Sequence, residues 1–566
     1  MELKNRLKEH LQFIYKENYS DELLTKIHDL INFCKRKNID KKEKWNESDI
    51  VLITYGDSII NNRDKPLAVL QRFLKKNISD VISTVHILPF FPYSSDDGFS
   101  VIDYKKVNPE LGSWIDIKNL ENDFFLMFDL VINHISQQSE WFQGYLNGET
   151  QYRDFFIEVD PQTDLSEVVR PRSLPLLTKV ITSAGEKHVW TTFSDDQIDL
   201  NFSNPEVLVE MLKVLLFYIE KGTKILRLDA IAFLWKKLGT SCLHLPETHQ
   251  VVKFFRDVME YLDPTSIVLT ETNVPNKENL SYFGNGDEAH MVYQFSLPPL
   301  LLYTLYTGNS EYLNQWAIKI PELPENNTFF NFTASHDGIG VRPLEGLLPD
   351  KEKELLFSQM VMNGGQISTK TNADGSESPY ELNITYFDAL KETKFGPDNL
   401  QEKRFICSQT IMTALQGIPA FYIHSLTATQ NYIEGVQKTG RARTINRMKW
   451  DENKLLEELI GDTSTARVFN ELISILKIRK NEPAFHPSGW QEIIDFHSSV
   501  FIIRRTSRNN YSQVLSVSNI TRTTVDIDLS ELLETYEYTD VIAGKKLPYN
   551  LAISLQPYQT MWIKNM

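Results

Sequence analysis

Short, continuously apolar segments recur along the chain from residue 50 onward, and segments with helical spacing separate most of them. Apolar runs without polar alternation are typical of parallel strands that are buried on both faces. Eight such runs begin at Ile50, Thr84, Phe124, Thr223, Ser266, Ala289, Thr328 and Ile418. The pattern therefore predicts an α/β fold built on a (β/α)8 TIM barrel.

The segment before the first predicted strand has a helical pattern instead. Apolar residues recur there at helical spacing, at Leu3, Leu7, Leu11 and Ile14. A second helical pattern follows Ser20, whose hydroxyl suits the capping position of a helix. We therefore expect a helical N-terminal extension over residues 1–47.

Two separations between predicted strands are too long for a simple strand–helix repeat. Residues 135–203, after the third strand, predict a small inserted domain B. Residues 344–403, after the seventh strand, contain the loop signals NGGQ, NADGSES and FGPD, which favour a lid or an acceptor-site loop. Short, often alternating runs predict an antiparallel β domain over 488–566. The barrel itself is expected from 48–134, 204–343 and 404–487.

Composition and charge narrow the function classes. Of the 566 residues 42% are hydrophobic and 24% charged, which is typical of a globular protein. The 59 Lys plus Arg and 75 Asp plus Glu give a formal net charge of −16, which argues against nucleic acid or an anionic membrane as a partner. No apolar run reaches the ~20 residues of a membrane span, and the first residues do not resemble a signal peptide. We expect a cytoplasmic protein.

The three cysteines, Cys34, Cys242 and Cys407, are too far apart in sequence for a disulfide framework or a paired metal motif. His244 and His249 lie near Cys242, but their spacing fits no helical pair of metal ligands. No dinucleotide-binding or P-loop glycine motif occurs either. We therefore expect neither a metal nor a cofactor, and the sequence leaves the oligomeric state open.

Polar residues interrupt the apolar runs near their C-terminal ends, where a (β/α)8 barrel carries its active site. These residues are Asp129 and His134 in the third run, Arg227 and Asp229 in the fourth, Glu271 in the fifth, and His336 and Asp337 in the seventh. A single carboxylate at such a position could simply cap the next helix. Three carboxylates that converge from three strands indicate catalysis instead.

A pair of carboxylates that flanks a glycosidic bond can act as nucleophile and general acid/base. Arg227 should favour the anionic form of Asp229, as a nucleophile requires. Glu271 would need a raised pKa to donate a proton to the leaving oxygen. Asp337 could hold sugar hydroxyls and stabilise developing positive charge.

Four short segments carry a resemblance to a known family. They read DLVINH at Asp129–His134, RLDA at Arg227–Ala230, TETN at Thr270–Asn273 and ASHDG at Ala334–Gly338. At these segments the chain resembles the α-amylase family, glycoside hydrolase family 13. The resemblance implies that Asp229 is the nucleophile, Glu271 the general acid/base and Asp337 the transition-state stabiliser. It also implies that His134, Arg227 and His336 contact the donor sugar.

Further segments resemble the sucrose phosphorylase-like subgroup of that family: VHILPFFPYSSDDGFSVIDY, ELGSW, RPRSLPLLT, GTSC, FSLPPLLLY, HDGIGV and RARTINR. This resemblance implies a retaining double displacement in which phosphate, not water, resolves the glucosyl enzyme. It adds Asp96, Phe99, Gln197 and Arg443 to the donor-sugar site. Because a phosphate dianion needs cationic donors, the candidates for the phosphate and acceptor site are Arg170, Arg172 and Arg342, with Tyr380 and Glu381 beside them.

Three features depart from the sucrose phosphorylases: Asn273 where a His is expected, the sequence RPLEG after HDGIGV, and Glu381 where a Gln is typical. With the N-terminal extension, they resemble glucosylglycerate phosphorylases. The implied reaction converts 2-O-α-D-glucosyl-D-glycerate and phosphate to α-D-glucose 1-phosphate and D-glycerate. Glycerate and phosphate are both anions, so one arginine, such as Arg342, could serve both.

Alternatives remain open at this point. The same chemistry would suit a sucrose or sucrose 6-phosphate phosphorylase, and a hydrolase would use the same carboxylates. A non-catalytic carbohydrate-binding protein is disfavoured by the intact set of three carboxylates. Arg342 could instead pair with Glu345, and Arg170 and Arg172 could be solvated loop residues.

Overall fold

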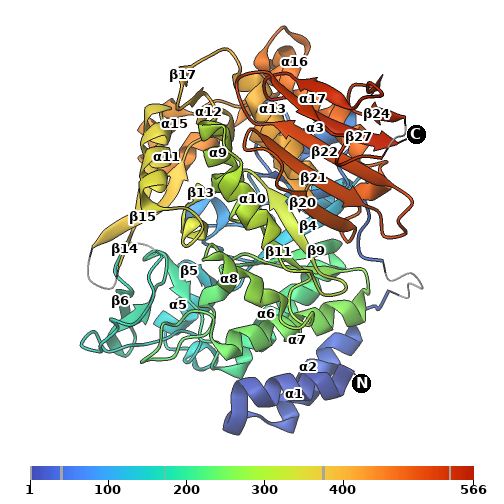
Figure 1. The fold of residues 1–566 in the computed structure, drawn as a ribbon. Helices are drawn as coiled ribbons and strands as arrows, with labels where there is room; N and C mark the ends of the chain where they lie inside the picture. Colours follow the sequence, from blue (N-terminus) through green and yellow to red (C-terminus); the bar gives the residue numbers. More distant parts are fainter. Residues whose placement is uncertain (1–2, 38–42, 172–173, 373–375, 535–536, 566) are drawn as a thin grey trace.

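The computed structural model describes residues 3–37, 43–171, 174–372, 376–534 and 537–565 (Figure 1). Eight strands close into a barrel in the order β1-β18-β12-β11-β10-β9-β4-β3, and every neighbouring pair is parallel. Their bounds are β1 Val51–Thr54, β3 Thr84–Ile87, β4 Phe125–Val131, β9 Thr223–Asp229, β10 Ile267–Thr270, β11 Met291–Tyr293, β12 Thr328–Phe332 and β18 Ile418–Tyr422. All eight predicted runs are barrel strands, so the predicted (β/α)8 barrel is confirmed.

Helices separate the barrel strands. The main ones are α3 Pro66–Asn77, α4 Trp114–Glu121, α6 Pro205–Glu220, α7 Pro246–Leu262, α9 Leu297–Thr307, α13 Gln401–Ala414 and α17 Ser464–Arg479. Three of them, α3, α6 and α7, begin with proline. Proline fits there because the first backbone N–H groups of a helix have no partner within the helix and the ring already fixes a helical φ.

The first and last strands of the insertion after β4 lie side by side, so the insertion ends next to its starting point at the barrel. It contains α5 Glu140–Leu146 and a hairpin of β6 Leu177–Thr182 and β7 Gly185–Trp190. Its first strand, β5 His134–Ser136, pairs antiparallel with its last, β8 Gln197–Asp199, so that His134 lies opposite Asp199. This pairing brings Gln197 beside His134 although more than sixty positions separate them.

The insertion after β12 forms a small sheet with a helix, outside the barrel. Its three-stranded sheet has the order β13-β15-β14, with β13 Ile339–Gly340, β14 Gln366–Thr371 and β15 Glu377–Asn383. Helix α11 Asp350–Met362 joins β13 to β14. Because β13 and β15 are antiparallel, Glu381 lies opposite Gly340, close to the end of β12.

The chain ends in a separate antiparallel sheet of six strands, coloured red in Figure 1. In sheet order the strands are β20 Trp490–Ile494, β21 Val500–Thr506, β22 Gln513–Asn519, β27 Thr560–Asn565, β24 Tyr538–Asp540 and β25 Lys545–Lys546. A further antiparallel pair consists of β23 Val525–Asp528 and β26 Ala552–Leu555. The predicted C-terminal β domain is therefore confirmed, whereas the exact domain boundaries stay predictions.

Two helices precede the barrel, α1 Leu3–Tyr15 and α2 Asp21–Phe33, and Ser20 caps α2 by accepting a hydrogen bond from the N–H of Leu23. In Figure 1 they lie at the end of the molecule opposite the C-terminal sheet. Helix α1 docks on α7, where Asp257 accepts hydrogen bonds from His10 and pairs with Arg6, each at 2.9 Å. Among the described residues no helix combines the length and the apolar character that a membrane crossing requires.

The docking of α1 depends on its buried apolar face, so Leu11→Ala should lower the thermal stability. Leu11 is fully buried, and truncating such a leucine typically costs about 2–5 kcal/mol. The melting temperature, measured by differential scanning calorimetry, should fall. Lys8→Ala, on the exposed face of the same helix, is the control and should change it little; an equal effect of both variants would contradict the docking.

Candidate active site

Three carboxylates from three strands line one cavity at the C-terminal end of the barrel. Asp229 ends β9, Glu271 directly follows β10, and Asp337 lies in the loop after β12. The cavity also receives eight further residues singled out from the sequence: Asp96, Phe99, His134, Gln197, His336, Tyr380, Glu381 and Arg443. The structure thus brings together residues from the barrel and from both insertions.

Arg227 lies beneath this cavity and joins its carboxylates. It is almost fully buried, and its Nη1 donates to Asp229 Oδ1 at 2.6 Å and to Asp129. Its Nε donates to the hydroxyl of Tyr293 at 3.1 Å, and its Nη2 lies 3.9 Å from Glu271 Oε2. The parallel register of β4 and β9 places Asp129 directly opposite Arg227. One guanidinium therefore contacts the carboxylates of three strands.

The pKa values of Asp229 and Glu271 are both raised. Burial raises the pKa of Asp229 to about 8, against the attraction of Arg227 and with the support of the charge on Glu271. Burial likewise raises the pKa of Glu271, as a proton donor needs. As expected from the sequence, Arg227 favours the anionic form of Asp229 by lowering its pKa, but the loss of hydration outweighs this one ion pair. Arg227 still bonds Asp229 more closely than Glu271, so it favours ionisation of Asp229.

Asp337 is the carboxylate that stays ionised. Burial alone would raise its pKa, but Arg443 and weaker neighbouring charges hold that pKa below its usual range. Arg443 Nη1 lies 2.7 Å from Asp337 Oδ1, while its Nη2 and its Nε bond Glu381, the latter at 3.1 Å. Glu381 thus orients the arginine that orients Asp337. Glu381, which the sequence predicted at the acceptor site, is therefore held in an ion pair with Arg443.

Aromatic and imidazole rings form the opposite wall. The Phe99 ring is stacked on the His336 ring with centroids 4.8 Å apart. His134 Nε2 lies 2.9 Å from the Phe99 carbonyl oxygen, to which Gln197 Nε2 also donates at 3.1 Å. A flat apolar ring beside polar groups is a suitable surface for a sugar.

Sequence reasoning missed Asn446 and Arg447, although it had singled out the segment RARTINR. Asn446 Nδ2 donates to the carbonyl oxygens of Ser335 and Asp337, each at 3.0 Å. Arg447 Nε donates to the carbonyl oxygen of His336 at 2.8 Å, and its Nη1 bonds Asp97 at 2.6 Å. The third arginine of the motif, four positions after Arg443, was the available signal.

Two glycines allow the loop after β12 to pass between its neighbours. A Cβ on Gly340 would lie 2.5 Å from Asn273 Oδ1, and one on Gly338 would lie 2.9 Å from the Cβ of Glu381. Either side chain would force the loop away from the cavity. The glycines of HDGIGV therefore provide close approach, so that Asp337 can lie between the strand ends.

The predicted phosphate-binding arginines do not line this cavity. Arg342 is buried and its nearest ion-pair contact is Glu345 at 3.7 Å; within the described chain its Nε has no hydrogen-bond partner. Arg170 lines another depression, between the inserted domain and β14. Arg172 lies outside the described residues. Their roles stay predictions.

The chain has a (β/α)8 barrel with insertions after β4 and β12 and with three carboxylates at or just after the ends of β9, β10 and β12. This combination defines a class of enzyme. Its members cleave or transfer glycosyl groups with a pair of carboxylates. Comparisons with known proteins identify the family and the group within this class of enzyme.

Residues 78–337 match the family described as "Alpha amylase, catalytic domain". A glucosylglycerate phosphorylase of Spirochaeta thermophila is 44% identical over 100% of this chain and 99% of its own length. The glucosylglycerate phosphorylase of Escherichia coli is 43% identical over 99% of this chain and all of its own length. The crystal structure of the sucrose 6F-phosphate phosphorylase from Thermoanaerobacter thermosaccharolyticum matches with a TM-score of 0.74 at 28% identity, over 88% of this chain and 97% of that one. The chain therefore belongs to the α-amylase family and, within it, to the group that contains the glucosylglycerate phosphorylases.

The raised pKa of Asp229 predicts a pH-dependent cost to stability. Between pH 3.8, the ordinary pKa of an aspartate, and about pH 8, the folded protein holds a proton that the unfolded chain releases. The contribution of Asp229 to the free energy of unfolding therefore falls as the pH rises through that window. Asp229→Asn removes the titration. Its melting temperature relative to that of the unmodified protein should therefore increase with pH across the window.

The control for this measurement is Asp462→Asn, because the Asp462 side chain is 95% exposed. Its melting temperature should follow that of the unmodified protein at every pH. A constant difference between Asp229→Asn and the unmodified protein across the window would show that the pKa of Asp229 is not raised.

Proposed function

We propose that this protein is a retaining glucosyl phosphorylase that acts on 2-O-α-D-glucosyl-D-glycerate. With phosphate it forms α-D-glucose 1-phosphate and D-glycerate, and the reaction is reversible. The observation that carries this proposal is the near-complete alignment with curated glucosylglycerate phosphorylases at 43–44% identity. The three carboxylates in one cavity support it.

In the first half-reaction, the ionised form of Asp229, which its bond to Arg227 favours, attacks the anomeric carbon on the face opposite the glycerate. Glu271 gives its proton to the glycosidic oxygen as that bond breaks, and D-glycerate leaves. The product is a β-glucosyl ester of Asp229. The raised pKa of Glu271 supports its role as the proton donor.

In the second half-reaction, a phosphate oxygen attacks the same carbon and the ester bond to Asp229 breaks. Glu271, now ionised, accepts the proton of the attacking phosphate oxygen. Two inversions restore the α configuration in glucose 1-phosphate. The contacts of a single guanidinium with Asp229 and Glu271 support a short carboxylate separation, as a retaining mechanism requires.

The donor glucose would occupy the part of the cavity beside Asp337 and the stacked rings. We propose that Asp337 stabilises the oxocarbenium-like transition state, since it stays ionised. The residues proposed to contact the sugar are Asp96, Phe99, His134, Gln197, Arg227, His336 and Arg443. All of them except Arg227 line the cavity, and Arg227 acts from beneath through Asp229.

The acceptor site presents an electrostatic problem, because glycerate and phosphate are anions. Five carboxylates line the cavity, at Asp96, Asp229, Glu271, Asp337 and Glu381, and Arg443 is already paired with two of them. Arg342 follows the lining residue Gly340 by two positions, and its guanidinium has only the distant Glu345 as an ion-pair partner among the described residues. We therefore propose Arg342 as the cation for both anions, with Tyr380 at the acceptor side.

The acceptor can be identified by supplying α-glucose 1-phosphate with one acceptor at a time and measuring phosphate release. The acceptors are D-glycerate, fructose, fructose 6-phosphate, glycerol and water alone. Release should be fastest with D-glycerate and should vanish in Asp229→Asn. Dominance of fructose or fructose 6-phosphate would replace the proposed acceptor, and dominance of water would make the protein a hydrolase.

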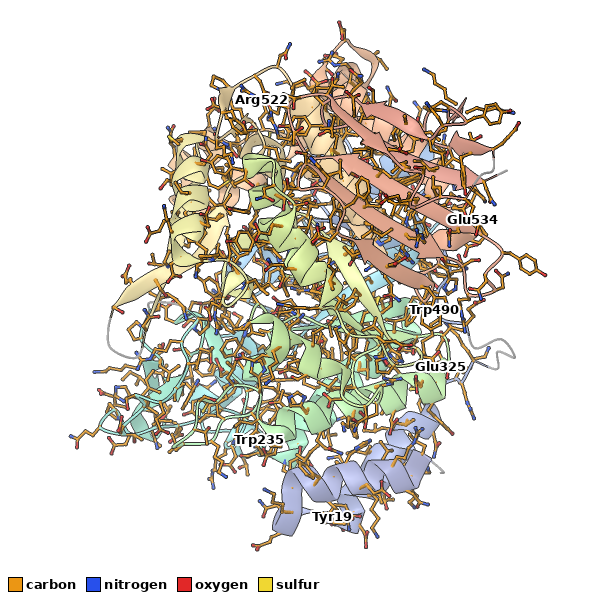
Figure 2. All side chains as sticks on the ribbon, viewed as in Figure 1. Tyr19, Trp235, Glu325, Trp490, Arg522 and Glu534 are labelled. Atoms are coloured by element: carbon orange, nitrogen blue, oxygen red, sulfur yellow. The ribbon has the colours of Figure 1, made fainter. Side chains whose placement is uncertain are left out.

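The proposed role of Arg342 predicts a selective defect. Arg342→Ala should raise the KM for D-glycerate and for phosphate by about tenfold or more, the value of a charge-assisted hydrogen bond. The KM for glycerol, which has no charge, should change far less. Arg522→Ala, which removes an exposed arginine of the C-terminal domain (Figure 2), is the control. Equal losses with charged and neutral acceptors would refute the role.

A further inference from the structure

A buried lysine outside the proposed reaction chemistry lies close to the donor-sugar site. Lys236 belongs to the segment WKKLGTSC after β9, and only 4% of its side chain is exposed. Its ammonium lies 2.5 Å from Asp199 Oδ2 and 2.6 Å from Asn133 Oδ1. Asp199 ends the inserted domain, whereas Asn133 follows β4. The lysine thus joins the insertion to the barrel.

The ammonium determines how the Asn133 amide is oriented. An ammonium has donors only, so the carbonyl oxygen of the amide must face it and the NH2 group must face away. That NH2 group lies 3.1 Å from Asp199 Oδ2 and 3.2 Å from His134 Nδ1. A flipped amide would place its NH2 group against the ammonium, donor against donor, and its carbonyl oxygen against Asp199 Oδ2, acceptor against acceptor.

The oriented amide in turn determines the state of His134. Because Asn133 Nδ2 is a donor, His134 Nδ1 must carry a lone pair, and the proton of the neutral ring lies on Nε2. From there it points to the carbonyl oxygen of Phe99 at 2.9 Å. Gln197 Nε2 also lies 3.1 Å from His134 Nε2, but it is satisfied by donating to the same carbonyl oxygen.

We propose that Lys236 is a positioning residue which, through Asn133, fixes the Nε2–H tautomer and the orientation of His134 in the donor-sugar site. The catalytic consequence rests on the proposed function, whereas the tautomer does not. Burial lowers the pKa of His134, and the charge of Lys236 adds to this effect against that of Asp199. His134 is therefore held neutral, with one donor and one acceptor nitrogen.

Further contacts hold the residues of this network. Asp199 also accepts hydrogen bonds from the N–H and the hydroxyl of Thr192, at 2.8 and 2.6 Å. Trp235, which precedes Lys236 and is labelled in Figure 2, has its ring centroid 6.5 Å from that of Tyr15 in α1. Besides its ion pair with Asp199, Lys236 makes a second polar contact. This contact, with Asn133, connects Lys236 to the imidazole of His134, which the Asn133 amide also contacts.

The test removes the charge pair without leaving a buried carboxylate unpaired. In the double variant Lys236→Met/Asp199→Asn the Asn133 amide loses the group that orients it. The ring 15N resonances of His134, assigned by their absence in His134→Asn, should change from one neutral tautomer to a mixture. We expect kcat/KM for the α-glucoside to fall by about tenfold to a hundredfold, the cost of misplacing a group in a site.

The isosteric variant Asn133→Asp tests the same link with Lys236 retained. A carboxylate has only acceptors, so the proton of His134 should move to Nδ1 or the ring should become charged. The matched control is Lys44→Met/Glu260→Gln, which removes another lysine–glutamate pair, with side chains 6% and 28% exposed; neither residue lines the cavity. It should lower thermal stability and leave the His134 resonances unchanged.

Unchanged His134 resonances in both the double variant and Asn133→Asp would overturn the proposal, whatever happens to the melting temperature. A changed tautomer without loss of glucosyl transfer would overturn only the catalytic consequence. If the panel of acceptors refutes the proposed function, the resonances still decide the role of Lys236. The two hypotheses therefore fail separately.

Discussion

The active site depends on one buried guanidinium. Arg227 lies in β9, where it contacts one carboxylate of its own strand, one from each neighbouring strand, and the Tyr293 hydroxyl. Removing a charge from water is costly unless partners compensate it, so the arginine and its carboxylates require one another. The closed barrel supplies the compensation, because parallel register brings Asp129 opposite Arg227. The same cost explains why the pKa values of Asp229 and Glu271 are raised despite the positive charge.

The two insertions complete what the barrel begins. The insertion after β4 returns Gln197 and Asp199 to the side of His134, and the insertion after β12 brings Glu381 to Arg443. In both places a charged or polar group from an insertion orients a side chain that lines the cavity. The long segments between strands are therefore part of the site and not only a cover over it.

The negative net charge of the protein has a local counterpart in its cavity. Among the charged side chains that line it, five carboxylates stand against one arginine, which is already paired with two of them. Such a site suits a neutral sugar that becomes cationic in the transition state. Anionic acceptors need compensation from a cation beyond the lining, and the position of Arg342 behind Gly340 makes it the candidate.

The sequence by itself determined the barrel, because apolar runs buried on both faces leave a pattern that needs no partner to be recognised. It also indicated Asp229, Glu271 and Asp337, since carboxylates at strand ends are local features. Only the tertiary structure decided how Glu381, Arg443 and Asp337 combine, or that Asn446 and Arg447 support the same loop. It also decided the net pKa of Asp229, because burial outweighs the effect of Arg227 and is set by the surroundings, not by a nearby residue in the chain. Contacts between distant segments depend on how the insertions fold back onto the barrel, and a local sequence pattern does not predict them.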